Sequence, residues 1–416
     1  MNKIINFKYN FVKKCQLCNN VNLVGIHSFG FHPTVNNFLK TGTDNARVDY
    51  FPMELLLCKK CELVQLNVII NSETIFPKNY AYRSGTTEIL RDNFAYLRSQ
   101  IDSKKLLYNE ELIVDIGSND GTLLSNFNNN YRILGVEPTG VAKIANSKGI
   151  KTLNRIFDNK TADIILKKFG KAKIITAANV FAHIADIHKV IKSILKILDK
   201  DGVFISESHY LMGLINTLQY DTIYHEHLRY YSLRSLFKLF QLYNMEIFYA
   251  ERIPTHGGSI RVYASRKGKF KISNNVKKII NTEYSGKKLL IKLNDFSKNI
   301  SLSKLKINQL IYSNKLRGKK IVGISAPSRS STLINYLGLD ENIIDYICEK
   351  KGSLKIGKNI PGTNIPVVLE DRIYKDQPEI ALIFSWHIAS DLIKIFKKNG
   401  FQGKFLIPLP KPRIID

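Results

Sequence analysis

Long apolar runs are missing from this chain of 416 residues. No stretch approaches the roughly 20 apolar residues that a membrane-spanning helix requires. The N-terminal segment MNKIINFKYNFVKKC also lacks the hydrophobic core and small-residue cleavage site of a signal peptide. We therefore expect a cytoplasmic protein without a membrane partner, in which the 44% of apolar residues form packed cores.

Cysteine and acidic residues are scarce as well. The five cysteines form two pairs and one isolated residue, Cys348, which is not the pattern of a secreted disulfide framework. The 62 Lys and Arg outnumber the 35 Asp and Glu, and the net charge is +27. Such a charge favours an anionic partner. Lysine occurs here together with abundant Asn and Ile, as a biased gene composition would produce, so we interpret most lysines as solvated side chains.

The two cysteine pairs predict a metal site within residues 1–75. Cys15 and Cys18 form one C-x-x-C pair, and Cys58 and Cys61 form the other. This spacing lets each pair bind one side of a tetrahedral ion, and four thiolates leave no open coordination position. We expect structural zinc, whose binding folds a module too small to be stable alone. Zinc ribbons occur in nucleic-acid-binding proteins and in enzymes, so the motif does not indicate the function.

Strands alternate with helices from Leu112 onward, which predicts an α/β fold. The runs LIVDIG, RILGVEP, AKIITAANVF and GVFISES are expected strands of one mostly parallel sheet, which MEIFYAERI and GSIRVYASR complete. After a lysine-rich helical stretch, a second strand, loop and helix unit begins at KKIVGISAPSRSST. We expect three domains: a zinc-binding domain over 1–75, a Rossmann-like domain over 76–267 and a C-terminal Rossmann-like α/β domain over 268–416.

The first of these strands ends in a loop suited to a small ligand. After Asp115 comes a G-x-x-x-G loop formed by Gly117, Ser118, Asn119, Asp120 and Gly121. It lacks the G-x-G-x-x-G pattern of a dinucleotide site, but its glycines allow a tight turn with room for a ligand. The next strand ends in Glu137, which is placed to accept hydrogen bonds from ribose hydroxyls, and a third ends at Asn179. This arrangement is typical of the S-adenosylmethionine (SAM) site of class I methyltransferases.

The segment YDTIYHEHLRYYS gathers polar and aromatic side chains. Its candidate residues are Tyr224, His225, Glu226, His227, Tyr230 and Tyr231. A metal site is disfavoured, because the H-E-x-x-H spacing of a helical zinc protease is absent. General-base chemistry fits better, because a carbon acid next to a ketone needs a base of near-neutral pKa and a partner that orients it. A polar surface cluster without a catalytic role is the alternative.

Together these motifs resemble a known family. The two C-x-x-C pairs are followed by YRSGTT, VDIGSNDG, ANVFAHIAD, YDTIYHEHLRYYS, HGGSIRVY and PGTNIPV. From Cys15 to about Trp386, the chain resembles the nucleotide-sugar C-methyltransferases of deoxysugar biosynthesis, which include the C-3 methyltransferases of branched sugars. The resemblance implies a SAM-dependent class I methyltransferase domain between a zinc-binding domain and a C-terminal domain that contributes to nucleotide-sugar binding. It also implies a dTDP-linked 4-keto-6-deoxysugar as the substrate.

The resemblance assigns roles to individual residues. His227 would remove the C-3 proton as the general base, with Tyr224 and Glu226 assisting and His183 close to the reacting sugar. The residues expected to bind the substrate are Tyr80, Tyr82, His225, His256, Ser328, Arg329 and Thr332. The last three belong to a loop and helix start whose N–H groups and hydroxyls could hold a diphosphate. The C-terminal domain departs from the family pattern in ISAPSRSST, CEKK and FSWHIAS, so the sugar and the nucleobase stay open.

Other functions fit the motifs less well. A sugar O-methyltransferase is the nearest alternative, because a histidine base would serve it equally well. A zinc-ribbon nucleic-acid methyltransferase would explain the charge, but Asn179 is not followed by the Pro-Pro-aromatic motif of an adenine amino-methylase. The spare thiol, Cys348, lies outside the methyltransferase domain, which disfavours a cytosine C-5 enzyme. The intact cofactor loop disfavours a non-enzymatic binding protein. We expect a nucleotide sugar, not nucleic acid, as the partner, and a monomer or weak dimer.

Overall fold

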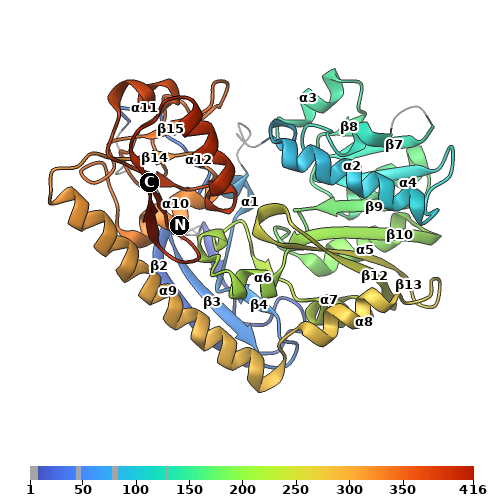
Figure 1. Ribbon diagram of the computed structural model, residues 1–416. Helices are drawn as coiled ribbons and strands as arrows, with labels where there is room; N and C mark the ends of the chain where they lie inside the picture. Colours follow the sequence, from blue (N-terminus) through green and yellow to red (C-terminus); the bar gives the residue numbers. More distant parts are fainter. Residues whose placement is uncertain (1–7, 44–47, 77–82, 128–129) are drawn as a thin grey trace, which may run out of the picture.

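The computed structural model describes residues 8–43, 48–76, 83–127 and 130–416. This part of the chain forms a four-stranded N-terminal sheet, a seven-stranded central sheet and a six-stranded C-terminal sheet, with a separate pair of strands. In Figure 1 the central and C-terminal sheets lie in two arms, and the N-terminal sheet lies between them toward the lower edge. The long helix α9 (Gly286–Lys315) runs along that edge from the central arm to the C-terminal arm.

The N-terminal sheet has the strand order β11-β4-β3-β2. Three of its strands are consecutive and antiparallel: β2 (Leu23–Pro33), β3 (Tyr50–Cys58) and β4 (Val64–Leu66). The fourth, β11 (Arg229–Tyr230), comes from the central part of the chain and pairs with β4. Beside this sheet lie β1 (Tyr9–Phe11), β5 (Val68–Ile70) and the short helix α1 (Ser72–Ile75). Residues 224–227, which we call the YHEH segment, lie one residue before β11 and are therefore held beside the N-terminal sheet.

The central sheet has the order β12-β13-β10-β9-β6-β7-β8, and all neighbouring strands are parallel except β13, which is antiparallel to both of its neighbours. Its strands are β6 (Leu112–Ile116), β7 (Arg132–Val136), β8 (Thr152–Leu153), β9 (Ala172–Ala178), β10 (Leu198–His209), β12 (Met245–Ile253) and β13 (Ser259–Arg266). The helices around it include α2 (Glu88–Ser103), α3 (Ala142–Ser147), α4 (Asn159–Phe169), α5 (Ile187–Ile197) and α7 (Leu233–Gln241). The parallel strands all point their carboxyl ends to one edge, which is where such sheets bind ligands.

Helix α5 shows how the sequence produces this packing. Apolar residues recur every three or four positions and are all buried: Ile187, Val190, Ile191, Ile194 and Ile197. This spacing places them on one face of the helix, toward the sheet. Asp186 caps the helix, because its carboxylate accepts a hydrogen bond from the backbone N–H of Lys189 at 3.0 Å.

The C-terminal sheet has the order β16-β15-β14-β17-β18-β19, and only β19 is antiparallel to its neighbour. Its strands are β14 (Ile321–Ile324), β15 (Ile347–Glu349), β16 (Val367–Leu369), β17 (Ile380–Ile383), β18 (Lys404–Ile407) and β19 (Arg413–Ile415). Its helices are α10 (Ser328–Leu337), α11 (Asp371–Asp376) and α12 (Ala389–Lys398), and α8 (Asn274–Thr282) precedes α9. Along the chain this order is 3-2-1-4-5-6, so the connections diverge between β14 and β17 and create a ligand-binding switch point.

The α/β fold class predicted from the sequence is confirmed. The six strand runs expected in the central sheet form β6, β7, β9, β10, β12 and β13. The lysine-rich stretch forms α8 and α9. Among the described residues, no helix combines the length and the apolar character that crossing a bilayer requires.

Candidate metal centre and active site

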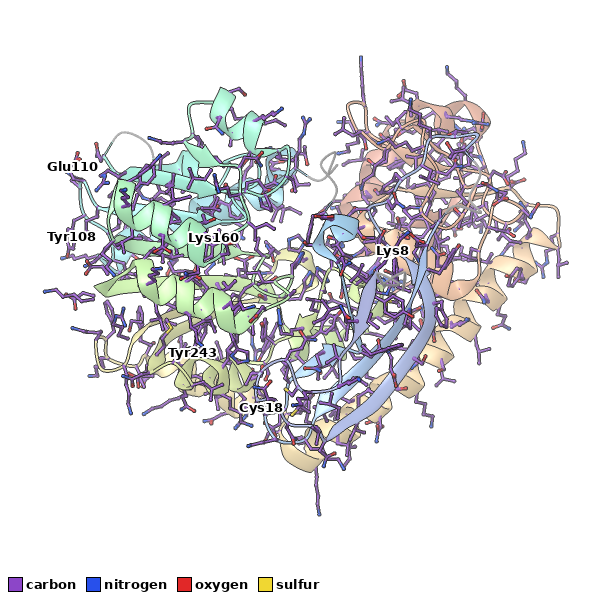
Figure 2. All side chains as sticks on the ribbon, turned by 180° about the vertical axis from the view of Figure 1, so that it is seen from behind. Lys8, Cys18, Tyr108, Glu110, Lys160 and Tyr243 are labelled. Carbon is purple, nitrogen blue, oxygen red and sulfur yellow. The ribbon has the colours of Figure 1, made fainter. Side chains whose placement is uncertain are left out.

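The four paired cysteines meet at one end of the N-terminal sheet. Cys15 and Cys18 lie in the turn after β1, and Cys58 and Cys61 flank the turn between β3 and β4. Their sulfur atoms all lie within 4.8 Å of one another, with 3.4 Å from Cys15 to Cys61 and 3.6 Å from Cys18 to Cys58. Zinc–sulfur bonds of about 2.3 Å in a tetrahedron give sulfur separations of about 3.8 Å, so the cluster fits one zinc ion. Figure 2 shows Cys18 at the lower end of this sheet.

The electrostatics of the cluster also favour a cation. The hydrogen bond from the Cys61 thiol lowers the pKa of Cys15 to about 5, and the same contact raises the pKa of Cys61 far above its ordinary value. Burial raises the pKa of Cys18 to about 11. Adjacent thiolates repel one another, and a bound Zn²⁺ removes that penalty. The four cysteines therefore fit the structural zinc that their spacing predicts.

The G-x-x-x-G loop after β6 depends on its two glycines. Gly117 has φ +70° and Gly121 has φ +79°, in the region that side chains rarely adopt. A Cβ atom at Gly117 would lie 2.4 Å from Cγ2 of Val180, and one at Gly121 would lie 2.9 Å from Cδ1 of Ile150. Both the turn and the close packing of the loop therefore require glycine at these positions.

Two buried carboxylates lie at the ends of β6 and β7. One Glu137 oxygen accepts a hydrogen bond from the backbone N–H of Asn119 at 3.0 Å, and the other accepts from the N–H and hydroxyl of Thr139 at 2.9 and 2.6 Å. Asp115 accepts from the Thr176 hydroxyl at 2.6 Å, and burial raises its pKa to about 7. Glu137 thus supports the loop from the strand end where a ribose is expected, whereas Asp115 bonds across to β9.

Three buried polar atoms near the same strand ends have no hydrogen-bond partner among the described residues. They are the hydroxyl oxygen of Ser118, the amide oxygen of Asn179 and the hydroxyl oxygen of Ser208. Ser118 follows β6, Asn179 follows β9, and Ser208 is the penultimate residue of β10. Buried polar groups are normally paired, so these atoms are suited to contact a polar ligand. The edge therefore fits SAM.

A short 3₁₀ turn, η2 (Ser84–Thr86), lies against this loop. The backbone N–H of Ser84 donates to the side-chain oxygen of Asn119 at 2.9 Å, and that of Gly85 donates to Asp120 at 3.3 Å. The turn at Ser84 and Gly85 therefore covers the cofactor loop. Tyr80 and Tyr82, the predicted substrate contacts just before it, lie outside the described residues.

His227 follows the 3₁₀ turn η4 (Tyr220–Thr222) and is buried. Its Nδ1 lies 2.7 Å from the backbone oxygen of Thr222. A carbonyl oxygen can only accept, so Nδ1 carries the proton and Nε2 is the acceptor nitrogen. Burial, assisted by His183, lowers the pKa of His227 well below its ordinary value. The ring is therefore neutral with its proton on one nitrogen, and burial makes it a weaker base than the near-neutral pKa expected from the sequence.

Further rings surround His227. Its ring centre lies 4.0 Å from that of Tyr224, 4.6 Å from that of His209 and 4.8 Å from that of His183. His256 lies 5.4 Å from His209. Burial lowers the pKa of His183 and of His256 to about 4, and lowers that of His209 well below its ordinary value. The four imidazoles, which we call the histidine cluster, are thus neutral at physiological pH.

Glu226 lies where three parts of the chain meet. One of its carboxylate oxygens accepts a hydrogen bond from the side-chain amide of Asn36 at 2.6 Å. The amide oxygen of Asn36 accepts from the hydroxyl of Ser328 at 2.9 Å. Asn36 follows β2 of the N-terminal sheet, and Ser328 begins α10 of the C-terminal part.

Arg329 reaches from α10 to the histidine cluster. Its guanidinium donates to the backbone oxygen of His256 at 3.1 Å and lies 3.3 Å from Nδ1 of His387. Its Nε lies 3.7 Å from a carboxylate oxygen of Asp221, and Trp386 donates to that oxygen at 2.7 Å. These contacts bring the C-terminal switch point against the loop that carries His227.

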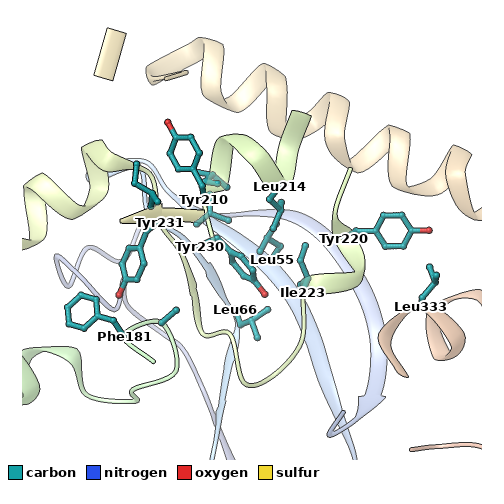
Figure 3. Close-up of a cluster of buried hydrophobic side chains, with 14 of the residues drawn as sticks. Leu55, Leu66, Phe181, Tyr210, Leu214, Tyr220, Ile223, Tyr230, Tyr231 and Leu333 are labelled. Atoms are coloured by element: carbon teal, nitrogen blue, oxygen red, sulfur yellow. The ribbon is translucent and has the colours of Figure 1, made fainter. Parts of the chain in front are cut away.

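Buried apolar side chains pack around the segment over residues 220–227, which carries His227 (Figure 3). Tyr220 and Ile223 of the loop are fully buried, together with Leu55 and Leu66 of the N-terminal sheet and Leu333 of α10. Because large buried side chains hold the backbone in one position, this packing restricts the loop between the three parts of the chain.

The structure brings most of the predicted site residues together, but two lie apart. His225 turns toward the N-terminal sheet, where its Nε2–H donates to the Pro52 oxygen at 3.1 Å and its ring contacts Phe51 at 5.8 Å. Thr332 lies one turn inside α10 and is 1% exposed. Neither side chain contacts the histidine cluster among the described residues.

Several residues of the site were not predicted from the sequence, among them His209, Asn36, Asp221 and Trp386. His209 is the last residue of β10, so its position at a strand end could have indicated it. Asn36 and Asp221 acquire their importance from side chains distant in sequence, and no local pattern marks them.

Comparisons with known proteins cover all three parts of the chain. A family model described as a putative zinc binding domain matches residues 15–76, one described as a methyltransferase domain matches 82–249, and one described as a C-methyltransferase C-terminal domain matches 254–410. The chain is 29% identical to C-methyltransferase NovU of Streptomyces niveus over 412 residues, which is 97% of each chain.

Two solved structures align with part of the chain. The YcgJ protein of Bacillus subtilis is 15% identical with a TM-score of 0.34, and the alignment covers 42% of this chain and 100% of that one. Magnesium protoporphyrin IX methyltransferase of Synechocystis PCC 6803, with bound SAH, is 13% identical with a TM-score of 0.34, over 43% of this chain and 84% of that one.

Proposed function

We propose that this chain, which is similar to a C-methyltransferase over nearly its whole length and carries a four-cysteine cluster suited to zinc, methylates a carbon atom beside the ketone of a nucleotide-linked sugar. The proposed substrate is a dTDP-linked 4-keto-6-deoxysugar, and C-3 is the proposed acceptor. One observation supports this proposal most strongly. The buried, neutral His227 holds its proton on Nδ1 against the Thr222 oxygen, so that Nε2 can accept a proton from carbon.

The base acts first in this proposal. A ketone acidifies the neighbouring C–H bond, and Nε2 of His227 takes that proton. The electron pair of the broken C–H bond forms an enolate, whose negative charge develops on the former ketone oxygen. The rings of His183 and Tyr224 lie beside the base, and each carries a hydrogen-bond donor of the kind that stabilises such an oxygen.

The cofactor supplies the electrophilic methyl group when it is bound, and the enolate carbon receives it. Ser118, Asn119 and Glu137 would hold the cofactor at the edge of the central sheet. The chain's contribution is to align the donor with the carbon at a short distance, which can replace a large part of the entropic barrier. The segment at Ser84 covers the loop and would keep water from this site.

The nucleotide is assigned to the C-terminal part. The switch point between β14 and β17 opens toward the start of α10, where Ser328 and Arg329 lie. The N–H groups of a helix start and an arginine are suited to a diphosphate. The proposed domain division at residues 75 and 267 then gives each domain one role: zinc, cofactor and nucleotide. The zinc is structural, because four thiolates leave no coordination position for substrate.

Product analysis tests the proposal. The enzyme is incubated with SAM carrying a ¹³C methyl group and a panel of nucleotide-linked 4-ketosugars, and NMR identifies the atom that bears the label. We expect long-range ¹H–¹³C correlations that place the labelled methyl group on the carbon next to the ketone. The same sugar with its ketone reduced to a hydroxyl is the control, and it should not react. A label on oxygen, or methylation of the reduced sugar, would contradict the carbanion route.

A further inference from the structure

The loop over residues 221–227 is held at two points by side chains distant in sequence. Near its start, Asp221 meets Trp386 and Arg329 from the C-terminal part. Near its end, Glu226 meets Asn36 from the N-terminal part. Neither Trp386 nor Asn36 takes part in the proton transfer proposed above, so their contacts call for another explanation.

The contact at Asp221 is buried and directional. Trp386 Nε1–H donates to one carboxylate oxygen at 2.7 Å, and Arg329 Nε lies 3.7 Å from the same oxygen. The Arg329 guanidinium also lies 5.4 Å from the centre of the Trp386 ring. Asp221 is 1% exposed, and burial raises its pKa while Arg329 and Trp386 act in the opposite direction. A buried carboxylate is strongly destabilising without such partners, so this end of the loop depends on the C-terminal part.

The contact at Glu226 joins all three parts. Asn36 donates to Glu226 at 2.6 Å and accepts from Ser328 at 2.9 Å. The side chain of Asn36 therefore bridges the loop to the start of α10. Since Arg329 is the next residue of that helix, both ends of the loop are fixed relative to the same helix start.

The backbone oxygen that orients His227 lies between these two contacts in the sequence. Thr222 follows Asp221 directly, and its backbone oxygen holds the Nδ1–H of His227 at 2.7 Å. Because Thr222 is the next residue, a displacement of the Asp221 backbone would shift Thr222 and its carbonyl oxygen. Without the carbonyl, the His227 proton can move to Nε2, and Nε2 could then no longer accept a proton from carbon.

We propose that Asp221, Trp386 and Asn36 are positioning residues that hold His227 in its proton-accepting tautomer. This inference rests on the proposed function, in which His227 is the general base. The C-terminal part then has a second function besides binding the nucleotide. His227 keeps its proton-accepting tautomer only while that part packs against the loop.

Two variants each remove one contact at Asp221. Asp221→Asn removes the charge, and Trp386→Phe keeps an aromatic ring but removes the N–H donor. NMR of the full-length protein with ¹⁵N-labelled histidine, assigned with His227→Asn, reports which ring nitrogen of His227 is protonated without any substrate. We expect the proton on Nδ1 in the wild type, and a mixture of the two tautomers or the proton on Nε2 in both variants. The kcat for methyl transfer should fall by about tenfold to a hundredfold with nearly unchanged KM, because only alignment is lost.

One control variant and one fluorescence measurement separate a positioning role from a general loss of structure. Arg372→Lys changes another guanidinium of the C-terminal part, which lies 4.5 Å from the Tyr346 ring and pairs with Asp376. This variant should keep the wild-type tautomer and kcat. Trp386 is the single tryptophan of the chain, so its emission should shift to the red in Asp221→Asn if the contact opens.

The outcomes distinguish this inference from the proposed function. A wild-type tautomer and wild-type kcat in both variants would overturn the positioning role. If Asp221→Asn fails to fold, Trp386→Phe decides alone. A wild type that methylates no ketosugar, together with an altered tautomer in Trp386→Phe, would refute the proposed function and leave the positioning of His227 supported.

Discussion

The cysteine cluster and the histidine cluster each gather four side chains, but they are built in different ways. The cysteines come as two C-x-x-C pairs on two turns at one end of the N-terminal region. The imidazoles come from four separate segments: the chain after β9, the end of β10, the loop after η4, and the 3₁₀ turn η5 (Thr255–Gly257). The first cluster needs only local turns and a metal ion, whereas the second needs the assembled fold.

The two clusters also differ in charge. The thiols gain stability when they ionise around a cation. The imidazoles stay neutral because burial lowers their pKa. Loss of metal should therefore disrupt the first cluster, and acid should disrupt the second.

A single buried arginine connects the two clusters. Arg229 donates from one guanidinium nitrogen to the side-chain oxygen of Gln16 at 2.8 Å, and from the other to the backbone oxygen of Ile184. Gln16 lies within the first C-x-x-C pair, and Ile184 follows His183. The turn at Cys15–Cys18 thus supports the segment that carries His183. Loss of the metal should therefore also disturb the active site.

Removal of a zinc ligand should have the largest effect. In Cys58→Ser, bound zinc should fall well below one per chain and the free energy of unfolding should drop by several kcal/mol, because structural zinc contributes directly to folding. Methyl transfer should be lost as well. Cys348→Ser is the matched control, since this buried thiol donates to the Gly323 oxygen in the C-terminal sheet. Elemental analysis and thermal unfolding measure both variants, and full zinc occupancy in Cys58→Ser would refute the assigned ligand set.

Removal of the proposed base should abolish most activity without affecting the metal. His227→Asn should lower the rate of methyl transfer by about a hundredfold to ten-thousandfold, the usual range for loss of a general base. Zinc content and SAM affinity should stay at wild-type levels. His188→Asn, at a histidine of α5 outside the cluster, serves as the control and should keep its activity. Steady-state kinetics that show a wild-type rate in His227→Asn would exclude it as the base.

Loss of charge at the cofactor loop should have an intermediate effect. Glu137→Gln keeps the shape of the side chain but weakens the acceptor, so SAM binding should weaken by about 1.5 to 3 kcal/mol, the range for a hydrogen bond to a charged group. Glu111→Gln is the control at the amino end of β6, where Glu111 pairs with Lys173. Calorimetry on both variants measures the affinity. Equal affinities would mean that Glu137 does not contact the cofactor.

Acid should destabilise the fold gradually through its buried histidines. The pKa of His183, His225 and His256 is lowered to about 4 by burial, whereas an unfolded histidine titrates near 6.5. Between these values the unfolded chain binds more protons, so stability is complete above about pH 6.5 and is lost as the pH falls toward 4. Each such histidine contributes a slope of up to about 1.4 kcal/mol per pH unit. Thermal unfolding between pH 7.5 and 5 measures the sum, and a flat profile would contradict the neutral cluster.

The zinc centre and the cofactor loop could be predicted from the sequence because their residues are local. Each cysteine pair spans one turn, and the loop follows a strand that is apolar and fully buried. Glu137 and Asn179 could be placed because parallel strands end at one edge of a sheet. Spacing and strand order therefore carry this information, even without knowledge of the packing.

The surroundings of His227, the proposed base, could not be predicted in the same way. In the sequence, the YHEH segment forms one cluster of polar residues. In the structure, His225 contacts Pro52 of the N-terminal sheet, whereas His227 faces His183 and His209. This arrangement depends on the pairing of the following strand, β11, with β4. Asp221 and Asn36 matter only because Trp386 and Ser328 reach them from the C-terminal part. Contacts of this kind depend on how the three parts dock, and no periodicity in the chain encodes them.

Hydrogen exchange at the substrate carbon tests the central claim most directly. A nucleotide-linked 4-ketosugar is incubated in deuterated buffer with S-adenosylhomocysteine in place of the methyl donor, and NMR follows the proton on the carbon next to the ketone. The account predicts that the wild type exchanges this proton for deuterium and that His227→Asn, with the same cofactor affinity, does not. Exchange at the wild-type rate in His227→Asn would contradict the account and assign the base to another residue of the histidine cluster.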